Sequence, residues 1–322
     1  MPLQKRIAFA AISKQTAKGA PNATPTFGLG LRGGGIIDAG LEQENDGITF
    51  ASRVSGDSNR NGVNPAASLS TRLWPRSSGL LLYGALGGIV TTGAGPYTHT
   101  ITPGATLPYL TYFGQLDTEY HEVDDCKINT LEITWDGRAP VECQATLMGC
   151  GASFYRASWT PTNDENGQTR FIPPGGTFKL DTDSATPVTA PVTGGRITIN
   201  NNLVPVPLSA SVTPDDVFEA EAMLEIELRV IPPATTFWRT IVTGADAGTT
   251  ATGSVVYGSA EINYIIDASN DLKLTAPRVA WQAEYPDVDP AGGPVELTLT
   301  GRIHKPAGAA FTAVLKNAVV SY

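Results

Sequence analysis

Apolar and polar residues alternate in short runs along most of the chain, which is the pattern of strands that bury one face. Ser68–Leu73 is such a run and predicts a half-buried strand. Asp124–Thr134 and Pro140–Met148 are two more, and the Asp136–Gly137 pair between them predicts a tight hairpin. Gly79–Leu86 is instead densely apolar and stops at two glycines, which predicts one short helix.

The strictest alternation lies between residues 219 and 230. One face of this predicted strand carries Glu219, Glu221, Met223, Glu225, Glu227 and Arg229. The other face is apolar throughout. Two interpretations stay open: a solvated sheet face that discourages edge pairing, or an acidic wall that repels a negatively charged polymer. The net charge of -9 at pH 7 favours the wall.

Parts of the sequence occur twice in the same order. Three blocks align without internal gaps: Leu69–Gly87 with Ile226–Gly244, Cys126–Trp135 with Leu272–Trp281, and Pro140–Glu142 with Pro294–Glu296. Each pair of blocks shares only a few identities, but the order of a strand, a proline, a helix-like stretch and a hairpin is common to both halves. We therefore predict an internal duplication.

The duplication predicts an all-β chain of two tandem β-sandwich or barrel units, each with one short helix. Polar segments rich in Pro and Gly set the expected boundaries. These are an N-terminal arm at 1–25, a first unit at 26–156 with a long polar loop at 42–65, a linker at 157–176, a second unit at 177–305 and a C-terminal tail at 306–322.

Composition agrees with many short strands joined by turns. The 322 residues include 34 Gly and 24 Pro, and 41% are hydrophobic. No apolar run approaches the roughly 18 residues that a membrane-spanning helix needs. Lys5 and Arg6 precede a short apolar stretch, which we interpret as a basic arm rather than an export signal. Three cysteines do not form a disulfide framework, and we expect buried thiols made in a reducing cytoplasm.

No motif in the sequence nominates a catalytic or cofactor site. Gly28, Gly30 and Gly33 have a dinucleotide-binding spacing, but no helix pattern follows them, so a loop is the better interpretation. His121 lies among acidic residues, and a solvated acidic turn is favoured over a metal site. Basic residues are dispersed, which argues against a dedicated DNA-binding surface. We expect no catalytic residue, no metal and no cofactor.

The central region nevertheless resembles a known family. The residues that carry the resemblance are His99–Pro103, Leu107 and Pro108, Glu119–Glu122, Cys126–Asn129 and Leu147–Gly149. Together they are similar to the tail tube (major tail) protein of long-tailed, siphovirus-type bacteriophages. The similarity is densest from Leu69 to Gly149, and the order of elements continues through the second half.

The resemblance implies a structural virion protein. Members of the family form stacked rings in which the inner sheets of neighbouring subunits join around a lumen, and DNA leaves the capsid through this tube. The implied partners are further copies of the chain, a tape-measure protein, tail terminator and baseplate proteins, and double-stranded DNA in passage, with no membrane. The implied location is the virion tail, after synthesis in the bacterial cytoplasm.

The chain departs from the family in size, since many tube proteins are single units that form six-membered rings. Two units per chain predict rings of three chains with pseudo-sixfold symmetry. Glu219, Glu221, Glu225 and Glu227 are expected to line the lumen, because an acidic lining keeps DNA mobile. The expected ring-stacking residues are Lys5, Arg6, Lys14, Lys18, Ile48, Phe50, Arg53, Phe311 and Tyr322.

Two other classes of protein compete with this interpretation. A secreted or surface β-sandwich binding module would also have many strands, but it should show an export signal or an aromatic platform. A β-class enzyme would need a nucleophile with a hydrogen-bonded histidine.

Overall fold

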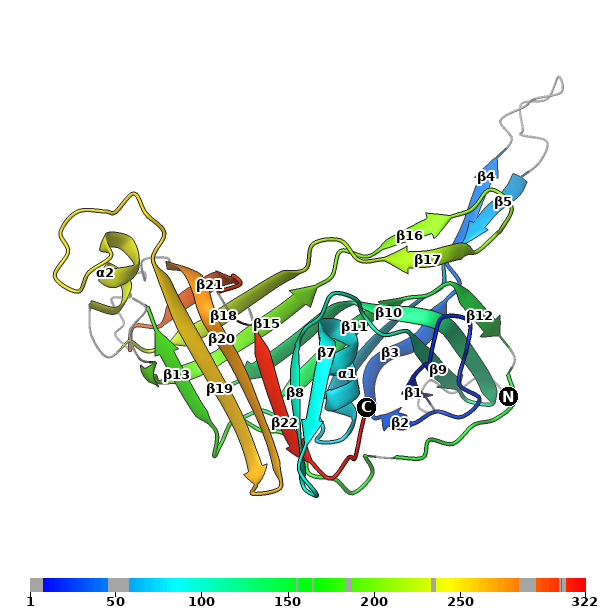
Figure 1. Cartoon of the computed structure of the whole chain (residues 1–322), viewed down its shortest axis with the longest axis horizontal. Helices are drawn as coiled ribbons and strands as arrows, with labels where there is room; N and C mark the ends of the chain where they lie inside the picture. Colours follow the sequence, from blue (N-terminus) through cyan, green and yellow to red (C-terminus); the bar gives the residue numbers. More distant parts are fainter. Residues whose placement is uncertain are drawn as a thin grey trace.

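A computed structural model describes residues 8–45, 58–154, 156–163, 165–182, 187–232, 236–283, 294–306, 308 and 311–322. The chain is mostly β, as the alternation predicted. Within the described residues there are two short helices, α1 (Ser77–Leu86) and α2 (Thr236–Thr243). The molecule is elongated: α1 lies near its middle, α2 at one end, and a pair of hairpins projects from the other end (Figure 1).

The strands of the first half precede residue 155. They are β1 (Ala8–Lys14), β2 (Phe27–Leu29), β3 (Leu31–Asp38), β4 (Leu41–Asn45), β5 (Ser58–Val63), β6 (Ala66–Arg72), β7 (Gly87–Thr92), β8 (Tyr97–Pro103), β9 (Leu110–Leu116), β10 (Glu119–Asp136), β11 (Glu142–Met148) and β12 (Gly151–Phe154).

The strands of the second half follow. They are β13 (Thr177–Asp181), β14 (Val188–Thr189), β15 (Val192–Asn200), β16 (Val204–Pro207), β17 (Pro214–Phe218), β18 (Met223–Val230), β19 (Tyr257–Asp267), β20 (Asn270–Ala283), β21 (Leu297–Ile303) and β22 (Thr312–Asn317).

The order of strand pairing is the same in both halves. In the first half the order is β3–β6–β11–β10, and in the second it is β15–β18–β21–β20. The predicted sequence correspondence places β6 over β18 and α1 over α2. Gly87 and Gly244, which correspond to each other, both follow their helix with a positive φ that glycine adopts without strain.

The two sets of four strands form one antiparallel sheet. The C-terminal half of β10, Thr130–Asp136, pairs residue by residue with Gly194–Asn200 of β15. The sheet therefore runs through eight strands, from β3 in the first half to β20 in the second. Among the described strands, β3 pairs only with β6, and Trp281–Ala283 of β20 pair only with β21. The sheet is thus open along β3, whereas at its other end only these three residues of β20 are open, because β19 pairs with β20 up to Ala280.

A second layer of strands covers the apolar face of the sheet. The N-terminal half of β10 bends into this layer, where it pairs with β9 and β12, and β1 pairs with both β9 and β2. In the second half, β22 joins β20 to the β7–β8 hairpin, and β13 pairs with β19. Alternate residues of both layers point into one apolar core, which includes Trp135 and Trp281, each 4% exposed.

The structure corrects the interpretation of residues 1–25 as an arm. Ala8–Lys14 form β1, a strand of the second layer, and Ala10, Ala11 and Ile12 are completely buried. The apolar run is too short to predict a helix, and its burial depends on pairing with β9, about a hundred residues later. Residues 157–176 are likewise no free linker, since Phe171 is fully buried and its amide donates to the Leu73 carbonyl.

The polar sheet face as candidate functional site

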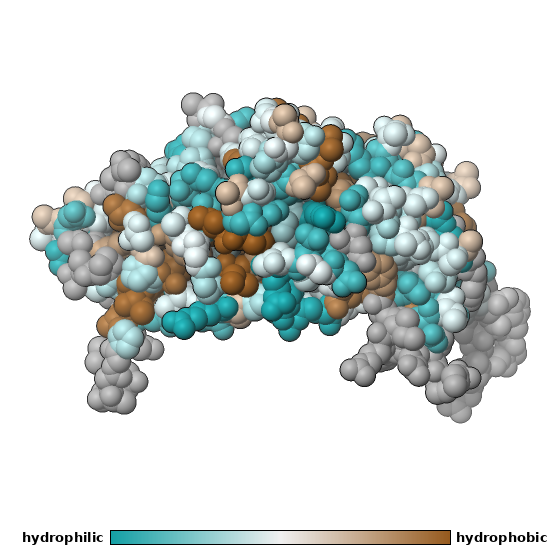
Figure 2. Space-filling model, turned by 90° about the horizontal axis from the view of Figure 1, so that it is seen from below, coloured by the Kyte–Doolittle hydropathy of each residue, from teal (hydrophilic) through white to brown (hydrophobic). Residues whose placement is uncertain are grey.

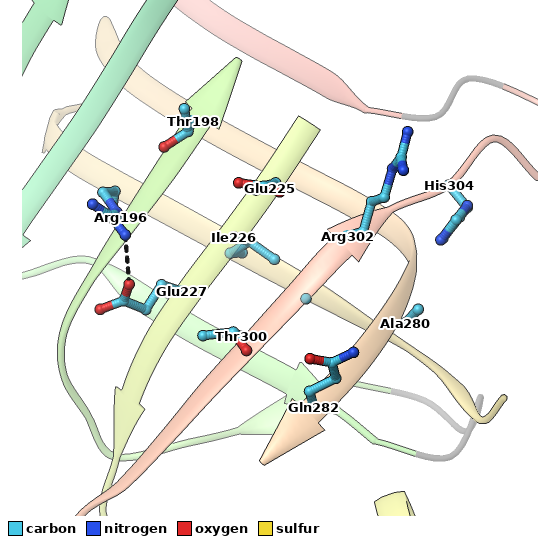
Figure 3. Close-up of a pocket in the computed structure, with 11 residues that line it drawn as sticks. Arg196, Thr198, Glu225, Ile226, Glu227, Ala280, Gln282, Thr300, Arg302 and His304 are labelled. Atoms are coloured by element: carbon cyan, nitrogen blue, oxygen red, sulfur yellow. Dashed lines mark hydrogen bonds and ion pairs between the residues drawn. The ribbon is translucent and has the colours of Figure 1, made fainter. Parts of the chain in front are cut away.

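The face of the eight-stranded sheet that points away from the core is polar. Its side chains come from alternate positions of the strands, such as Ser68 on β6, Gln144 on β11, Thr130 on β10 and Thr300 on β21. Shallow hollows lie along it, and residues from β15, β18, β20 and β21 line one of them (Figure 3).

Arginine and carboxylate side chains neutralise each other across neighbouring strands of this polar face. Nη2 of Arg196 on β15 lies 2.8 Å from Oε2 of Glu227 on β18, a contact drawn in Figure 3. Nη1 of Arg196 also lies 3.8 Å from Glu132 on β10. On β18, Glu225 stands opposite Arg302 of β21 in the strand register.

The same pairing continues toward the ends of the polar face. Arg32 of β3 pairs with Glu142 of β11. Arg229 of β18 reaches across β15 to Asp136 of β10, with Nη2 of the arginine 2.7 Å from Oδ1. Gly194 lies between these two residues, and a side chain there would overlap the guanidinium group. The polar face is thus a lattice of alternating charges.

The four predicted lumen glutamates are therefore separated by the fold. β18 begins at Met223, so only Glu225 and Glu227 belong to the strand. Glu221 precedes it, is 86% exposed at its side chain, and lies 3.3 Å from Arg302. The expectation that these four carboxylates form a uniformly negative surface is wrong, because arginines on β15 and β21 stand beside the strand. The alternation within 219–230 contained no information about these neighbours.

Glu219 has a different role from the other three. Its carboxylate lies 3.0 Å from Nζ of Lys127, which is 4% exposed, and it accepts a hydrogen bond from the Leu107 amide. Burial raises the pKa of the Glu219 carboxyl, but these hydrogen bonds outweigh it, so the pKa lies below its ordinary value of 4.5. Lys127 also donates to the Val217 carbonyl and lies 3.7 Å from Asp216. This cluster fixes the β16–β17 hairpin to β10.

Two hairpins occupy equivalent positions in the two halves. β4–β5 follows β3, and β16–β17 follows β15. They contact each other through a hydrogen bond from the Val63 amide to the Val212 carbonyl, 2.7 Å long, and we call them the double hairpin. The double hairpin projects from one end of the molecule (Figure 1). Its apolar side chains include Leu41, Val204, Leu208, Val212 and Phe218, all 49–60% exposed.

The predicted ring-stacking residues lie in several different places. Lys5, Arg6, Ile48, Phe50 and Arg53 fall outside the described residues. The other four, Lys14, Lys18, Phe311 and Tyr322, are described.

The four described candidates differ in exposure. Lys14 and Lys18 are exposed, and Nζ of Lys18 lies 3.2 Å from Asp215 of the double hairpin. Phe311 is 1% exposed and belongs to the core of the chain itself. The Tyr322 hydroxyl donates to the Arg76 carbonyl beside α1. Lys127 lies in a block that the sequence singled out, but the sequence gave no signal for its contacts with Glu219 and Val217, which hold the double hairpin in place.

Other chemistry is sparse in the part of the chain that the structure describes. No group of three or more His, Cys, Asp and Glu side chains gathers there in a metal-binding arrangement. Among the same residues, no helix is long and apolar enough to cross a membrane. The three cysteines are free and buried, as the sequence suggested.

Comparison with known proteins identifies the family. Residues 6–313, nearly the whole chain, match the phage tail tube protein family. The chain therefore belongs to that family. A comparison with curated proteins finds no match. The chain is thus a structural component of a phage tail, with a β-rich fold.

Proposed function

We propose that three copies of this tail tube protein close a ring, that the polar sheet face lines the lumen, and that stacked rings form a conduit for DNA. The observation that carries this proposal is the continuous sheet of eight strands, which is open along β3 at one end and at Trp281–Ala283 of β20 at the other. Head-to-tail pairing of these edges around a threefold axis removes both of them. Three chains then supply 24 strands (3 × 8) to one inner barrel.

The internal junction supports three chains rather than six. β10 and β15 already join two similar sets of four strands within one chain, over seven consecutive residue pairs. A ring of three chains repeats this junction six times, three times within chains and three times between them. The two kinds of junction differ in detail, which gives pseudo-sixfold rather than sixfold symmetry.

The charge lattice suits the passage of DNA. Lys and Arg side chains bind phosphates and release counterions, and such binding would slow the polymer. On the polar face, Arg196, Arg229 and Arg32 each lie beside a carboxylate, so their charge is balanced before DNA arrives. The lining therefore avoids attracting DNA because its arginines are paired with carboxylates, and not because acidic side chains are in excess.

The double hairpin is the proposed contact between rings. It projects beyond the sheet and exposes apolar side chains, and a projecting element of this kind is suited to contact the next ring along the tube. Lys14 and Lys18, at the surface of the first half, remain candidates for the same contact. We further propose that the tail is of the siphovirus type and that the tube assembles on a tape-measure protein. The tube then contacts tail terminator and baseplate proteins, and its role is structural rather than enzymatic.

Electron microscopy of the purified chain tests this function. We expect stacked rings with a central lumen. Threefold averaging should sharpen features that sixfold averaging blurs, because Asp136–Ala139 is a short connection and the corresponding Gln282–Gly293 is long. Particles without a lumen would refute the tube, and six complete chains per ring would refute the trimer alone.

A further inference from the structure

An arginine without a hydrogen-bond partner lies beside the open β3 edge of the polar face. Arg72 is the last residue of β6 and stands opposite Glu142 in the strand register. Nη1 of Arg72 is shielded from solvent and has no hydrogen-bond partner among the described residues. Buried polar groups in folded proteins are normally hydrogen-bonded. The guanidinium therefore lacks a contact that the described part of the chain does not supply.

The charges around Arg72 have the same sign. Glu142, the carboxylate opposite Arg72, is paired with Arg32. Burial lowers the pKa of the Arg72 guanidinium, and the charges of Arg170 and Arg32 lower it further. We call Arg32, Arg72 and Arg170 the arginine cluster. Its three positive charges stand against the one negative charge of Glu142, so a further anion would stabilise it.

The internal repeat shows which kind of group completes the cluster. The aligned blocks place Arg72 over Arg229. Arg229 stands opposite Gly194 of β15, and its Nη2 crosses that strand to Oδ1 of Asp136, 2.7 Å away at the end of β10. Within the chain, this arginine is thus held by a carboxylate that lies two strands away.

The corresponding position beside Arg72 is open. Leu31 of β3 pairs with Thr71, so Gly30 is the next residue opposite Arg72 and takes the place of Gly194. Among the described residues, β3 has no strand on its outer side. A carboxylate equivalent to that of the internal junction would therefore come from beyond this edge.

The connection after β20 carries suitable carboxylates. It corresponds to the connection after β10, with Gln282 in the place of Asp136. The residues that follow Gln282 lie outside the described part of the chain from 284 to 293. Their sequence contains no Lys or Arg and three acids, which are Glu284, Asp287 and Asp289. We call residues 284–289 the acidic segment. Its charge and its place in the repeat both match the arginine cluster.

The acidic segment cannot reach the arginine cluster of its own chain. β3 and β20 are the two ends of the sheet of eight strands, about 34 Å apart at roughly 4.8 Å per strand. Residues 284–293 are held at both ends, so their middle extends at most about 17 Å. The molecule is elongated in both views (Figure 1 and Figure 2), and in Figure 1 β20 ends on the side of α2 while β3 lies in the other half. Carboxylates of this segment that meet the cluster therefore belong to a second copy.

We propose that the arginine cluster binds the acidic segment of a second copy when the ring closes. This inference rests on the proposed ring, where the end of β20 meets the edge of β3, and it names the charges that hold this contact. Contacts like that of Arg229 with Asp136 then occur six times in a ring of three chains, three times within chains and three times between them. The contact also neutralises Arg72, which would otherwise offer an unpaired cation to DNA in the lumen.

Carbodiimide cross-linking of assembled rings tests the contact. This reagent joins an amine directly to a carboxylate in ion-pair contact with it. In rings of the Arg72→Lys chain, the introduced amine should be joined to a peptide that contains the acidic segment. Mixing isotopically heavy and light chains before assembly shows by mass spectrometry whether the joined peptides come from different copies. Arg138→Lys, at the exposed turn between β10 and β11, is the matched control and should not be joined to this segment.

A charge exchange separates the contact from folding. Arg72→Glu should not lower the melting temperature of the single chain, because Nη1 of Arg72 has no partner among the described residues to lose. It should raise the chain concentration needed for rings about tenfold or more, because the contacts between copies become repulsive. Reversing the acidic segment as well, with Glu284→Lys, Asp287→Lys and Asp289→Lys, should restore rings. Arg138→Glu carries the same change of charge and should leave assembly unchanged.

Each outcome decides a separate question. Rings in which the introduced amine is not joined to the acidic segment of another copy would overturn the inference and leave the tube function intact. Normal rings of the Arg72→Glu chain with altered DNA release would show that the arginine cluster meets DNA, and would also overturn it. A wild-type chain that forms no ring would overturn the proposed function, and this inference with it.

Discussion

Reversing two charges, those of Glu225 and Glu227, is the sharpest perturbation of the polar face. In a chain carrying Glu225→Lys and Glu227→Lys, each substitution changes the charge by +2, so the face gains +4 per chain and +12 per proposed ring (3 × 4). Arg196 loses its partner at 2.8 Å and keeps only Glu132 at 3.8 Å. Folding should persist, because exposed ion pairs of this kind contribute about 0–1 kcal/mol each.

The effect on DNA follows from counterion release. The logarithm of the binding constant falls with the logarithm of the salt concentration, with a slope of about -0.9 for each phosphate contact. If only two of the new cations in a ring reach phosphates, the slope changes by about -1.8. Affinity at about 50 mM salt should then exceed that at about 200 mM roughly twelvefold for each ring. In the proposed tube many stacked rings would act on the same DNA, so release should slow measurably.

The assay is the rate of DNA release from virions, followed with a fluorescent DNA-binding dye at the two salt concentrations. The variant should release DNA slowly at low salt and recover at high salt. Two controls separate charge from packing: Glu225→Gln with Glu227→Gln removes charge without reversing it, and Arg196→Glu with Glu227→Arg exchanges partners at constant net charge. Unchanged release at low salt from normally assembled tails would show that DNA does not meet this face.

Four further predictions concern the fold. Gly195→Ala should lower the free energy of unfolding by about 1–3 kcal/mol in chemical denaturation, because its Cβ would lie 2.6 Å from the Glu227 carbonyl oxygen. Gly253→Ala is the neutral control, because no atom lies within 4 Å of a Cβ added there. Lys127→Met should cost about 3 kcal/mol by leaving Glu219 without its partner, and hydrogen exchange should show a loosened β16–β17 hairpin. Because the folded pKa of Glu219 lies below 4.5, its stabilising contribution is present above that pH and is lost as pH falls through the folded value. A Val217 amide that keeps its protection from hydrogen exchange throughout an acid titration below pH 4.5 would contradict this. Ile12→Ala should cost about 2–5 kcal/mol and lower the melting temperature, whereas a mobile arm would tolerate it without change.

Local patterns in the sequence determined the individual elements. Alternation identified β6, β11 and β18, because a strand with one buried face requires it. Two glycines ended α1, and the Asp136–Gly137 pair turned β10 into β11, with Gly137 at positive φ. The repeated order of elements also indicated two similar halves, and strand pairing follows the same order in each. The signals for individual elements act within about twenty residues of chain, and only the repeat compares distant segments.

Only the tertiary structure decided which elements meet. β22 pairs with β8 although their residues are more than two hundred positions apart, and this places the end of the chain beside α1. Lys127 finds Glu219 in the same way. The sequence could not place arginines next to Glu225 and Glu227, since those partners come from neighbouring strands. Residue periodicity records which face of a strand is buried, whereas the charge of a surface depends on side chains that separate strands bring together.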